Sequence, residues 1–237
     1  MTVALPRPRR EIATYVRRSS RMTPAQQSWL AMYGPRFVVN VDLGKTLTRV
    51  AEQEPLDLVT LFGSTAPVVV EIGSGHGETL VAAAQAHPEW NFLAFEVFEA
   101  SVATTLGKLA GVGTDNVRMI VGDAVTGLTH LIPDASLSQV WIFFPDPWQK
   151  KRHHKRRLIS PKFVDLLAAK LVDGGTLRLA TDWEEYARHM EEVLDANPAF
   201  RFLSPDRFDL RPLTKFESRG VAQGRLIRDF SYQRWPR

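Results

Sequence analysis

Residues 143–157, FFPDPWQKKRHHKRR, place an aspartate between two prolines, directly ahead of a run of eight Lys, Arg and His side chains. A carboxylate repels phosphate, whereas the basic run attracts it. A site that only binds a polyanion therefore has no use for Asp146. Pro145 and Pro147 restrict the backbone around this aspartate, which suits chemistry that depends on position. We expect this stretch to combine binding of a polyanion with a reaction.

The basic run is one of three cationic segments in the sequence. Counting Lys, Arg, Asp and Glu, residues 1–21 carry +5, residues 150–157 carry +6 and residues 201–237 carry +5. The whole chain carries +4, so the remaining residues carry −12. A single charged run is most often a solvated face. Three such runs on an acidic body favour a nucleic-acid partner.

The composition limits the class of protein. The 237 residues, of which 44% are hydrophobic, suit one α/β domain with extensions. We expect a basic N-terminal arm with a short helix over residues 1–34 and the main domain over 35–237. The absence of cysteine excludes disulfides, zinc fingers, iron–sulfur clusters and cysteine nucleophiles. No apolar stretch approaches the length of a membrane span, and residues 1–21 lack an apolar signal region. These features predict a cytoplasmic protein without a membrane partner.

Short apolar runs separated by helical patterns predict the elements that position the reactive residues. Strands alternating with helices, such as those over 79–86 and 101–110, indicate a parallel sheet covered on both faces. The predicted strands are VVVEIG (68–73), NFLAFEV (91–97), NVRMIVGD (116–123), SQVWIFF (138–144) and TLRLAT (176–181). A helix over 183–196 and two closing strands, FRFL (200–203) and GRLIRDFSYQR (224–234), follow.

An earlier helix is predicted from its boundary residues. Thr23 is a suitable N-cap, Pro24 a suitable first helical residue, and Gln26 stands three residues after the cap. Gly34 is the expected stop.

The glycine-rich stretch EIGSGHGE (71–78) follows the first predicted strand. Gly73, Gly75 and Gly77 would let the backbone approach a ligand closely, although glycines also serve ordinary strand-to-helix turns. Glu96, which ends the second strand, follows Gly77 by 19 residues, near the spacing at which an acidic side chain binds ribose hydroxyls. In parallel sheets of this kind, ligands bind at the carboxyl ends of the strands.

Spacing and charge separate two classes of cofactor. A dinucleotide fingerprint is G-x-G-x-x-G, whereas this loop is G-x-G-x-G. Glu71 would repel a pyrophosphate but suits a cationic ligand such as S-adenosylmethionine. In that case Glu96 holds the ribose and Asp123, at the end of the third strand, lies near the adenine. Alternatively, Glu71 is a charge at a helix N-terminus and Asp123 a turn former.

Together these motifs resemble the bacterial tRNA (guanine-N7)-methyltransferases. The resemblance covers most of the chain, and its most specific motif is the proline-flanked aspartate with its basic tail. It implies the class I methyltransferase fold, an α/β Rossmann-like fold with a mostly parallel seven-stranded sheet and helices on both faces. The matching motifs are YVRRSSRMTPAQQ (15–27), EIGSGHGE (71–78), FFPDPWQKKRHHKRRL (143–158), ATDW (180–183) and TKFESRG (214–220).

The resemblance also assigns roles to individual residues. Its cofactor residues fall on Glu71, Glu96, Asp123 and Asp146, and Asp146 is also its catalytic candidate. Its substrate contacts fall on Lys150, Asp182, Thr214, Lys215, Phe216 and Glu217. Its RNA-binding segment falls on Arg152, His153, His154, Lys155, Arg156 and Arg157. The implied reaction transfers a methyl group from S-adenosylmethionine to N7 of a guanine in the variable loop of tRNA, without a second protein subunit.

The chemistry of guanine explains why carboxylates would serve this reaction. N7 has a lone pair and no proton, so it needs no general base, and catalysis depends on alignment and on tolerating positive charge on the ring. Asp146 and Asp182 can accept hydrogen bonds from the base edge. Trp148 either stacks on a flipped base or belongs to the core. The His, Asp and Glu residues show no metal-ligand spacing, so no metal is expected.

Two other classes of function fit these motifs less well. A nicotinamide-dependent oxidoreductase is disfavoured by the glycine spacing and by Glu71. A non-catalytic RNA-binding protein on a methyltransferase fold is disfavoured because all the expected carboxylates are present.

Overall fold

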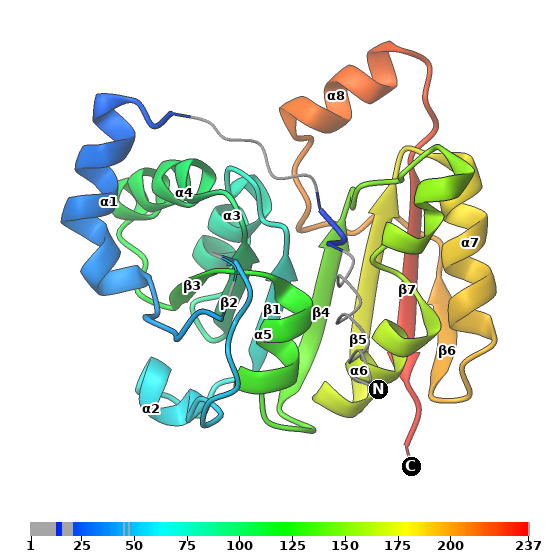
Figure 1. The fold of residues 1–237 in the computed structure, drawn as a ribbon, viewed down its shortest axis with the longest axis horizontal. Coiled ribbons are helices and arrows are strands. Elements are labelled where there is room, and N and C mark those ends of the chain that lie inside the picture. The colour runs from blue at the N-terminus through cyan, green and yellow to red at the C-terminus, as the bar shows by residue number, and fades with distance from the viewer. Residues whose placement is uncertain (1–12, 16–20, 45, 47, 237) are drawn as a thin grey trace, which may run out of the picture.

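A computed structural model describes residues 13–15, 21–44, 46 and 48–236 of the chain. In this part of the chain a seven-stranded sheet has the order β3-β2-β1-β4-β5-β7-β6 (Figure 1). The strands are β1 (Val68–Ile72), β2 (Asn91–Glu96), β3 (Val117–Val121), β4 (Leu137–Phe143), β5 (Leu171–Thr181), β6 (Phe200–Ser204) and β7 (Arg228–Arg234). Strands β1 to β5 run parallel, whereas β7 is antiparallel to both β5 and β6. The expected mostly parallel sheet is confirmed.

Helices cover both faces of this sheet because successive residues of a strand point to opposite sides. In β1, Val68, Val70 and Ile72 join a cluster with α5, α6 and α7, while Val69 joins a second cluster with α1, α3 and α4. The helices are α1 (Pro24–Phe37), α2 (Leu58–Phe62), α3 (Glu78–Ala86), α4 (Glu99–Val112), α5 (Ala124–Leu131), α6 (Pro161–Lys170), α7 (Glu184–Asp195), α8 (Lys215–Ala222) and the 3₁₀ helix η1 (Lys151–Arg156).

Helix α1 starts as predicted but ends later. Thr23 and Gln26 form the reciprocal capping box, with Pro24 as the first helical residue. The predicted stop at Gly34 is wrong, because the helix continues to Phe37. The side chain of Phe37 is fully buried in the second cluster, and this burial favours the additional turn. The expected boundary between arm and main domain at residue 34 therefore falls inside a helix.

Two strands begin several residues away from the expected positions, whereas the other strand boundaries differ by at most two residues. Strand β5 begins at Leu171 rather than at residue 176, because Leu171 pairs with Leu137 of β4 before the register shifts. Strand β7 begins at Arg228 rather than at residue 224, and the preceding residues connect it to α8. As Figure 1 shows, α8 stands beyond the carboxyl ends of β4 and β5, apart from the helices that cover the sheet. Within the described residues, no helix has both the length and the apolar character of a membrane span.

Candidate active site

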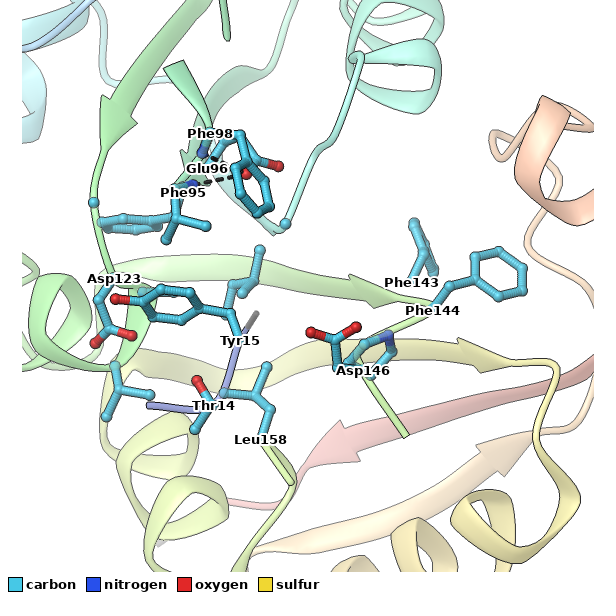
Figure 2. A pocket seen from close by; sticks show the side chains of 17 residues that line it. Thr14, Tyr15, Phe95, Glu96, Phe98, Asp123, Phe143, Phe144, Asp146 and Leu158 are labelled. Carbon is cyan, nitrogen blue, oxygen red and sulfur yellow. Dashed lines mark hydrogen bonds between the residues drawn. The ribbon is translucent and has the colours of Figure 1, made fainter. Parts of the chain in front are cut away.

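A cavity of about 220 Å³ lies at the carboxyl ends of β1, β2, β3 and β4 (Figure 2). Strand β1 has β2 on one side and β4 on the other, so the order of the sheet reverses here. Open α/β sheets bind their ligands at such a point. Four of the predicted cofactor residues, Gly73, Glu96, Asp123 and Asp146, line this cavity. Residues that follow different strands in the sequence thus come together at one site.

Glu96 holds the loops at the cavity together through its carboxylate. One oxygen accepts hydrogen bonds from the backbone N–H groups of Val97 and Phe98, at 2.7 and 2.9 Å, and the other accepts from Gly75 N–H at 2.8 Å. Burial raises the pKa of Glu96 above its usual value, although these backbone hydrogen bonds oppose the shift. The glycine loop and the end of β2 are therefore fixed relative to one another by one carboxylate.

Asp123 has two roles at once. It follows β3 by two residues and caps α5, where its carboxylate accepts hydrogen bonds from the backbone N–H and the hydroxyl of Thr126, at 2.9 and 3.1 Å. Its own backbone N–H donates to the carbonyl of Thr48 at 2.6 Å. Its local role is therefore that of a helix cap, where the alternative had been a turn former, and the same residue also lines the cavity.

The three glycines of the loop do not share one role. Gly73 and Gly75 have φ angles of 75° and 54°, and a Cβ added at either would meet no atom of the structure within 4 Å. Only glycine adopts this conformation readily, and the space beside these two residues is open. At Gly77 a Cβ would lie 2.3 Å from the Cγ2 of Thr105 on α4. Gly77 therefore allows α3 and α4 to pack closely, and only Gly73 belongs to the cavity lining.

Glu71 lies in β1 on the face that packs against α3, and it does not line the cavity. Its side chain is 4% exposed, and its Oε2 has no hydrogen-bond partner among the described residues. Burial, together with the nearby charges of Glu96 and Glu78, raises the pKa of Glu71 to about 8. An orphaned buried carboxylate beside an open glycine loop fits a cationic ligand, which would supply both a donor and a positive charge.

The raised pKa of Glu71 predicts a measurable pH dependence of stability. The protonated form is favoured in the folded chain, so the free energy of unfolding should be highest below the usual pKa of 4.5 and fall until about pH 8. Glu71→Gln should remove this decline and stabilise the ligand-free protein at pH 8 by a few kcal/mol. Chemical denaturation across this pH range tests the difference, with the exposed Glu52→Gln as the control. Parallel pH profiles of wild type and Glu71→Gln would contradict it.

Asp146 occupies a constrained turn after β4. Phe144 and Trp148 have left-handed φ angles of 54° and 44°, and the three residues between them are Pro145, Asp146 and Pro147. The prolines limit their own φ angles, so little freedom remains in this segment. Figure 2 shows the Asp146 carboxylate across the cavity from Asp123. The expectation that prolines would restrict this aspartate agrees with the backbone geometry.

Two residues near the N-terminus also line the cavity, although their types and spacing predict no role for them there. Thr14 and Tyr15 contribute to its wall, and the Tyr15 hydroxyl makes a short hydrogen bond with the hydroxyl of Thr48. The indole N–H of Trp148 donates to the carbonyl of Thr14 at 3.0 Å. Trp148 is thus partly buried, so it neither belongs to the core nor is fully exposed for stacking on a base. Its side chain holds Thr14 beside the cavity. No local pattern in the sequence could reveal contacts between residues so far apart.

The predicted substrate residues are spread over three neighbouring elements. Lys150 is exposed at the start of η1, and Asp182, directly after β5, pairs with Arg225 at 2.6 Å. Thr214 caps α8 by accepting a hydrogen bond from the backbone N–H of Glu217. Phe216 is 54% exposed, and its ring centroid lies 5.3 Å from that of Phe144.

Glu217 is buried and ion-paired with two arginines, Arg207 and Arg211. Its carboxylate is therefore occupied in this structure. The side chain of Lys215 lies outside what the structure describes.

The basic run forms an exposed surface beside the cavity, with one exception. Lys151, Arg152 and Lys155 are exposed, and the guanidinium of Arg156 lies over the ring of Trp148, 4.7 Å from its centroid. His153 also contacts this ring edge-on, and His154 is partly exposed.

Arg157 is the exception, because it is buried, pairs with Glu185 and donates to the carbonyl of Pro147 at 3.0 Å. Its guanidinium stabilises the turn and does not belong to the exposed cationic surface. Over residues 13–15, 21–44, 46 and 48–236, no cluster of His, Asp or Glu suits a metal ion.

The comparisons with known proteins agree with this geometry. A family model described as a putative methyltransferase matches residues 65–230. A tRNA (guanine-N7)-methyltransferase of Cutibacterium acnes is 45% identical, over 96% of this chain and 85% of that protein. The enzyme of the same name from Nocardioides is 45% identical, over 95% of this chain and 88% of that protein. Among solved structures, the 16S rRNA methyltransferase KamB has a TM-score of 0.55 at 18% identity, covering 82% of this chain and 98% of that chain, and it shares the fold.

Proposed function

Because the chain belongs to the family of the tRNA (guanine-N7)-methyltransferases, we infer that it transfers a methyl group from S-adenosylmethionine to N7 of a guanine in tRNA. We propose that the target guanine lies in the variable loop. The observation that supports this function best is the position of Asp146. It is held between two prolines at a ligand cavity and precedes an exposed run of cations. Binding of a polyanion and chemistry thus share one short segment.

The cavity and the glycine loop beside it suit S-adenosylmethionine. We propose that Glu96 binds the ribose hydroxyls, that Asp123 lies beside the adenine, and that the open backbone at Gly73 and Gly75 accommodates the methionine part. The unpartnered Oε2 of Glu71 would balance the positive charge of the ligand. When bound, the cofactor supplies an electrophilic methyl group on a sulfonium.

Two carboxylates would orient the target base. We propose that Asp146 accepts hydrogen bonds from the N–H groups of guanine and stabilises the positive charge that grows on the ring as N7 is alkylated. Asp182 would accept from the base edge after releasing Arg225, with which it is paired in this structure. An adenine would present a different pattern of donors to these oxygens, so the pair favours guanine.

The exposed cations of η1 would bind the tRNA backbone. Replacing Arg152 and Lys155 with alanine should weaken tRNA binding and lower the slope of log Kd against log salt by roughly 0.7–0.9 for each lost phosphate contact. Titrations with tRNA at several salt concentrations measure this slope. Affinity for adenosylhomocysteine should not change, and Arg188→Ala on α7, which alters an exposed cation elsewhere, is the matched control. An unchanged slope would mean that η1 is a solvated face and does not bind RNA.

Methyl transfer from labelled cofactor to total tRNA, followed by nucleoside analysis, tests the proposed function directly. N7-methylguanosine carries a fixed positive charge that makes its ring labile, so borohydride and aniline should break the product tRNA at one variable-loop guanine. Labelled tRNA without this break would reject N7 as the target. Binding of tRNA without methyl transfer would support the non-catalytic alternative.

We propose that the chain acts in the cytoplasm and without a second subunit. Activity of the purified chain alone would support the absence of a second subunit.

A further inference from the structure

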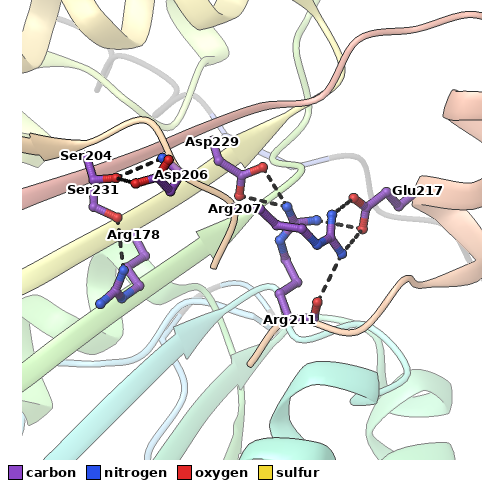
Figure 3. A network of polar contacts seen from close by, with 8 residues as sticks. All are labelled: Arg178, Ser204, Asp206, Arg207, Arg211, Glu217, Asp229 and Ser231. Carbon is purple, nitrogen blue, oxygen red and sulfur yellow. Dashed lines mark hydrogen bonds and ion pairs between the residues drawn. The ribbon is translucent and has the colours of Figure 1, made fainter. Parts of the chain in front are cut away.

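Arg211 lies in a buried polar cluster beside the proposed guanine site (Figure 3). Its side chain is 0% exposed. One terminal nitrogen donates to the Glu217 carboxylate of α8 at 2.6 Å, and the other donates to both oxygens of Asp229 on β7 at 2.7 Å. Arg207, which is 41% exposed, pairs with the same Glu217 from the solvent side. Arg211 therefore joins α8 to the sheet through three hydrogen bonds.

The same guanidinium also contacts the end of β4. It lies 5.4 Å from the ring centroid of Phe143 and 5.2 Å from that of Phe144, and both residues contribute to the lining of the cavity. Phe144 has the left-handed backbone described above, and its N–H donates to the carbonyl of Ala180 at 2.8 Å. Asp146 follows two residues later. One side chain thus contacts the turn that carries Asp146 and the helix that carries Phe216.

Stability alone does not explain this cluster. Buried ion pairs are often replaced by apolar residues without loss of stability, because removing charges from water costs about as much as the pairing returns. The Nε of Arg211 also lacks a hydrogen-bond partner among the described residues, which adds to the cost. A planar guanidinium fixes the relative positions of several hydrogen-bonded groups at once, which an apolar side chain cannot do.

We propose that Arg211 is a positioning residue for the transfer reaction. By holding Glu217, Asp229 and the Phe144 ring in one arrangement, it fixes the Asp146 turn against α8, so that the base enters a preformed site between them. The expected effect of Arg211 on the reaction rate rests on the proposed function. Its expected effect on the structure of the turn does not.

The test compares Arg211→Met with the matched control Arg207→Met, which removes the other arginine of Glu217 but no contact to Phe143 or Phe144. Arg211→Met should lower kcat for tRNA methylation by about 10–100-fold, the scale expected for a misplaced reacting group. Affinities for adenosylhomocysteine and tRNA should remain within about threefold of wild type, because neither site loses a contact. Arg211→Lys, which keeps the charge but not the planar fork, should recover only part of the rate. Arg207→Met should leave kcat within about threefold.

A second variant separates positioning from folding. Arg211→Met leaves Asp229 buried without its partner, whereas Arg211→Met combined with Asp229→Asn leaves no unpaired buried charge, since Glu217 keeps Arg207. The double variant should regain much of the unfolding free energy but not the rate. Recovery of kcat together with stability would show a merely structural role and overturn the proposal.

Hydrogen exchange provides a readout that does not depend on activity. In Arg211→Met and in the double variant, the backbone amides of Phe144, Asp146 and Trp148 should exchange faster than in wild type, while those of β1 and β2 should not change. Unchanged exchange in 144–148 would overturn the proposal even if wild type proved inactive on tRNA. An inactive wild type would by itself reject only the proposed function.

Discussion

Replacing Asp146 with asparagine should lower the rate constant of methyl transfer by about 10²–10³-fold, the scale for losing a preorganised electrostatic contact. Asparagine keeps the shape of the side chain but removes its charge and exchanges one acceptor oxygen for a donor amide. The N–H groups of guanine would then face the N–H groups of the amide. No negative charge would remain to stabilise the positive ring in the transition state. Single-turnover measurements with saturating tRNA and cofactor isolate this step from binding.

The pH profile of the same step distinguishes positioning from general-base catalysis at Asp146. Since N7 of guanine has no proton to lose, the single-turnover rate of wild type should vary by less than about threefold from about pH 6.5 to 8.5. A rate that rose tenfold per pH unit in a step shown to be chemical would contradict this and indicate a base. Asp173→Asn, at an exposed position near the start of β5, is the control and should keep the wild-type rate.

Replacing Glu96 with alanine should weaken binding of adenosylhomocysteine by roughly 1.5–3 kcal/mol, or about 10–150-fold in Kd. The proposed bonds to the ribose account for part of this loss. The structure adds a second cause, because the carboxylate also accepts hydrogen bonds from Gly75, Val97 and Phe98. Without it, the glycine loop and the end of β2 would lose their common support.

Glu96→Gln separates these two causes. Its remaining oxygen can still accept from Val97 and Phe98, but its amide cannot accept from Gly75. Calorimetric affinities in the order wild type, Gln, Ala are expected, with tRNA affinity unchanged throughout. Glu99→Ala, in the first turn of α4, is the control. Equal affinity of wild type and Glu96→Ala for adenosylhomocysteine would exclude the end of β2 from the cofactor site.

Much of the sheet could be predicted because each central strand is a short apolar run bounded by turn residues. Strand β1 is such a run, and Glu71 near its end does not interrupt it, since its side chain is buried with its neighbours. Boundaries were harder to predict where tertiary contacts decide them. Phe37 extends α1 past Gly34 by its burial, and the pairing of Leu171 with Leu137 lengthens β5.

The positions of Glu96, Asp123 and Asp146 could be predicted for a geometric reason. Each lies at or just after the carboxyl end of a parallel strand, and these ends meet at one edge of a sheet. The partners of charged side chains could not be predicted, because they depend on distant segments. Arg157 looks like the other cations of its run, yet Glu185 on α7 pairs with it and removes it from the surface. Tyr15 lies at the cavity through contacts with distant segments, since its hydroxyl bonds to Thr48 and the carbonyl of Thr14 accepts from the indole of Trp148.

The left-handed backbone at Phe144 and Trp148 has a consequence for attempts to make the protein more heat-resistant. A non-glycine residue in this conformation costs on the order of 1–2 kcal/mol. Glycine at either position would relieve this strain, but it would remove the contacts of the aromatic ring and lose more backbone entropy on folding. It would also release the backbone on both sides of Asp146, which the aromatic side chains now hold through Arg211 and Thr14. Glycine in this five-residue turn should therefore lower turnover without raising the melting temperature, and heat-resistant variants are better sought among the exposed residues of α1 and α7.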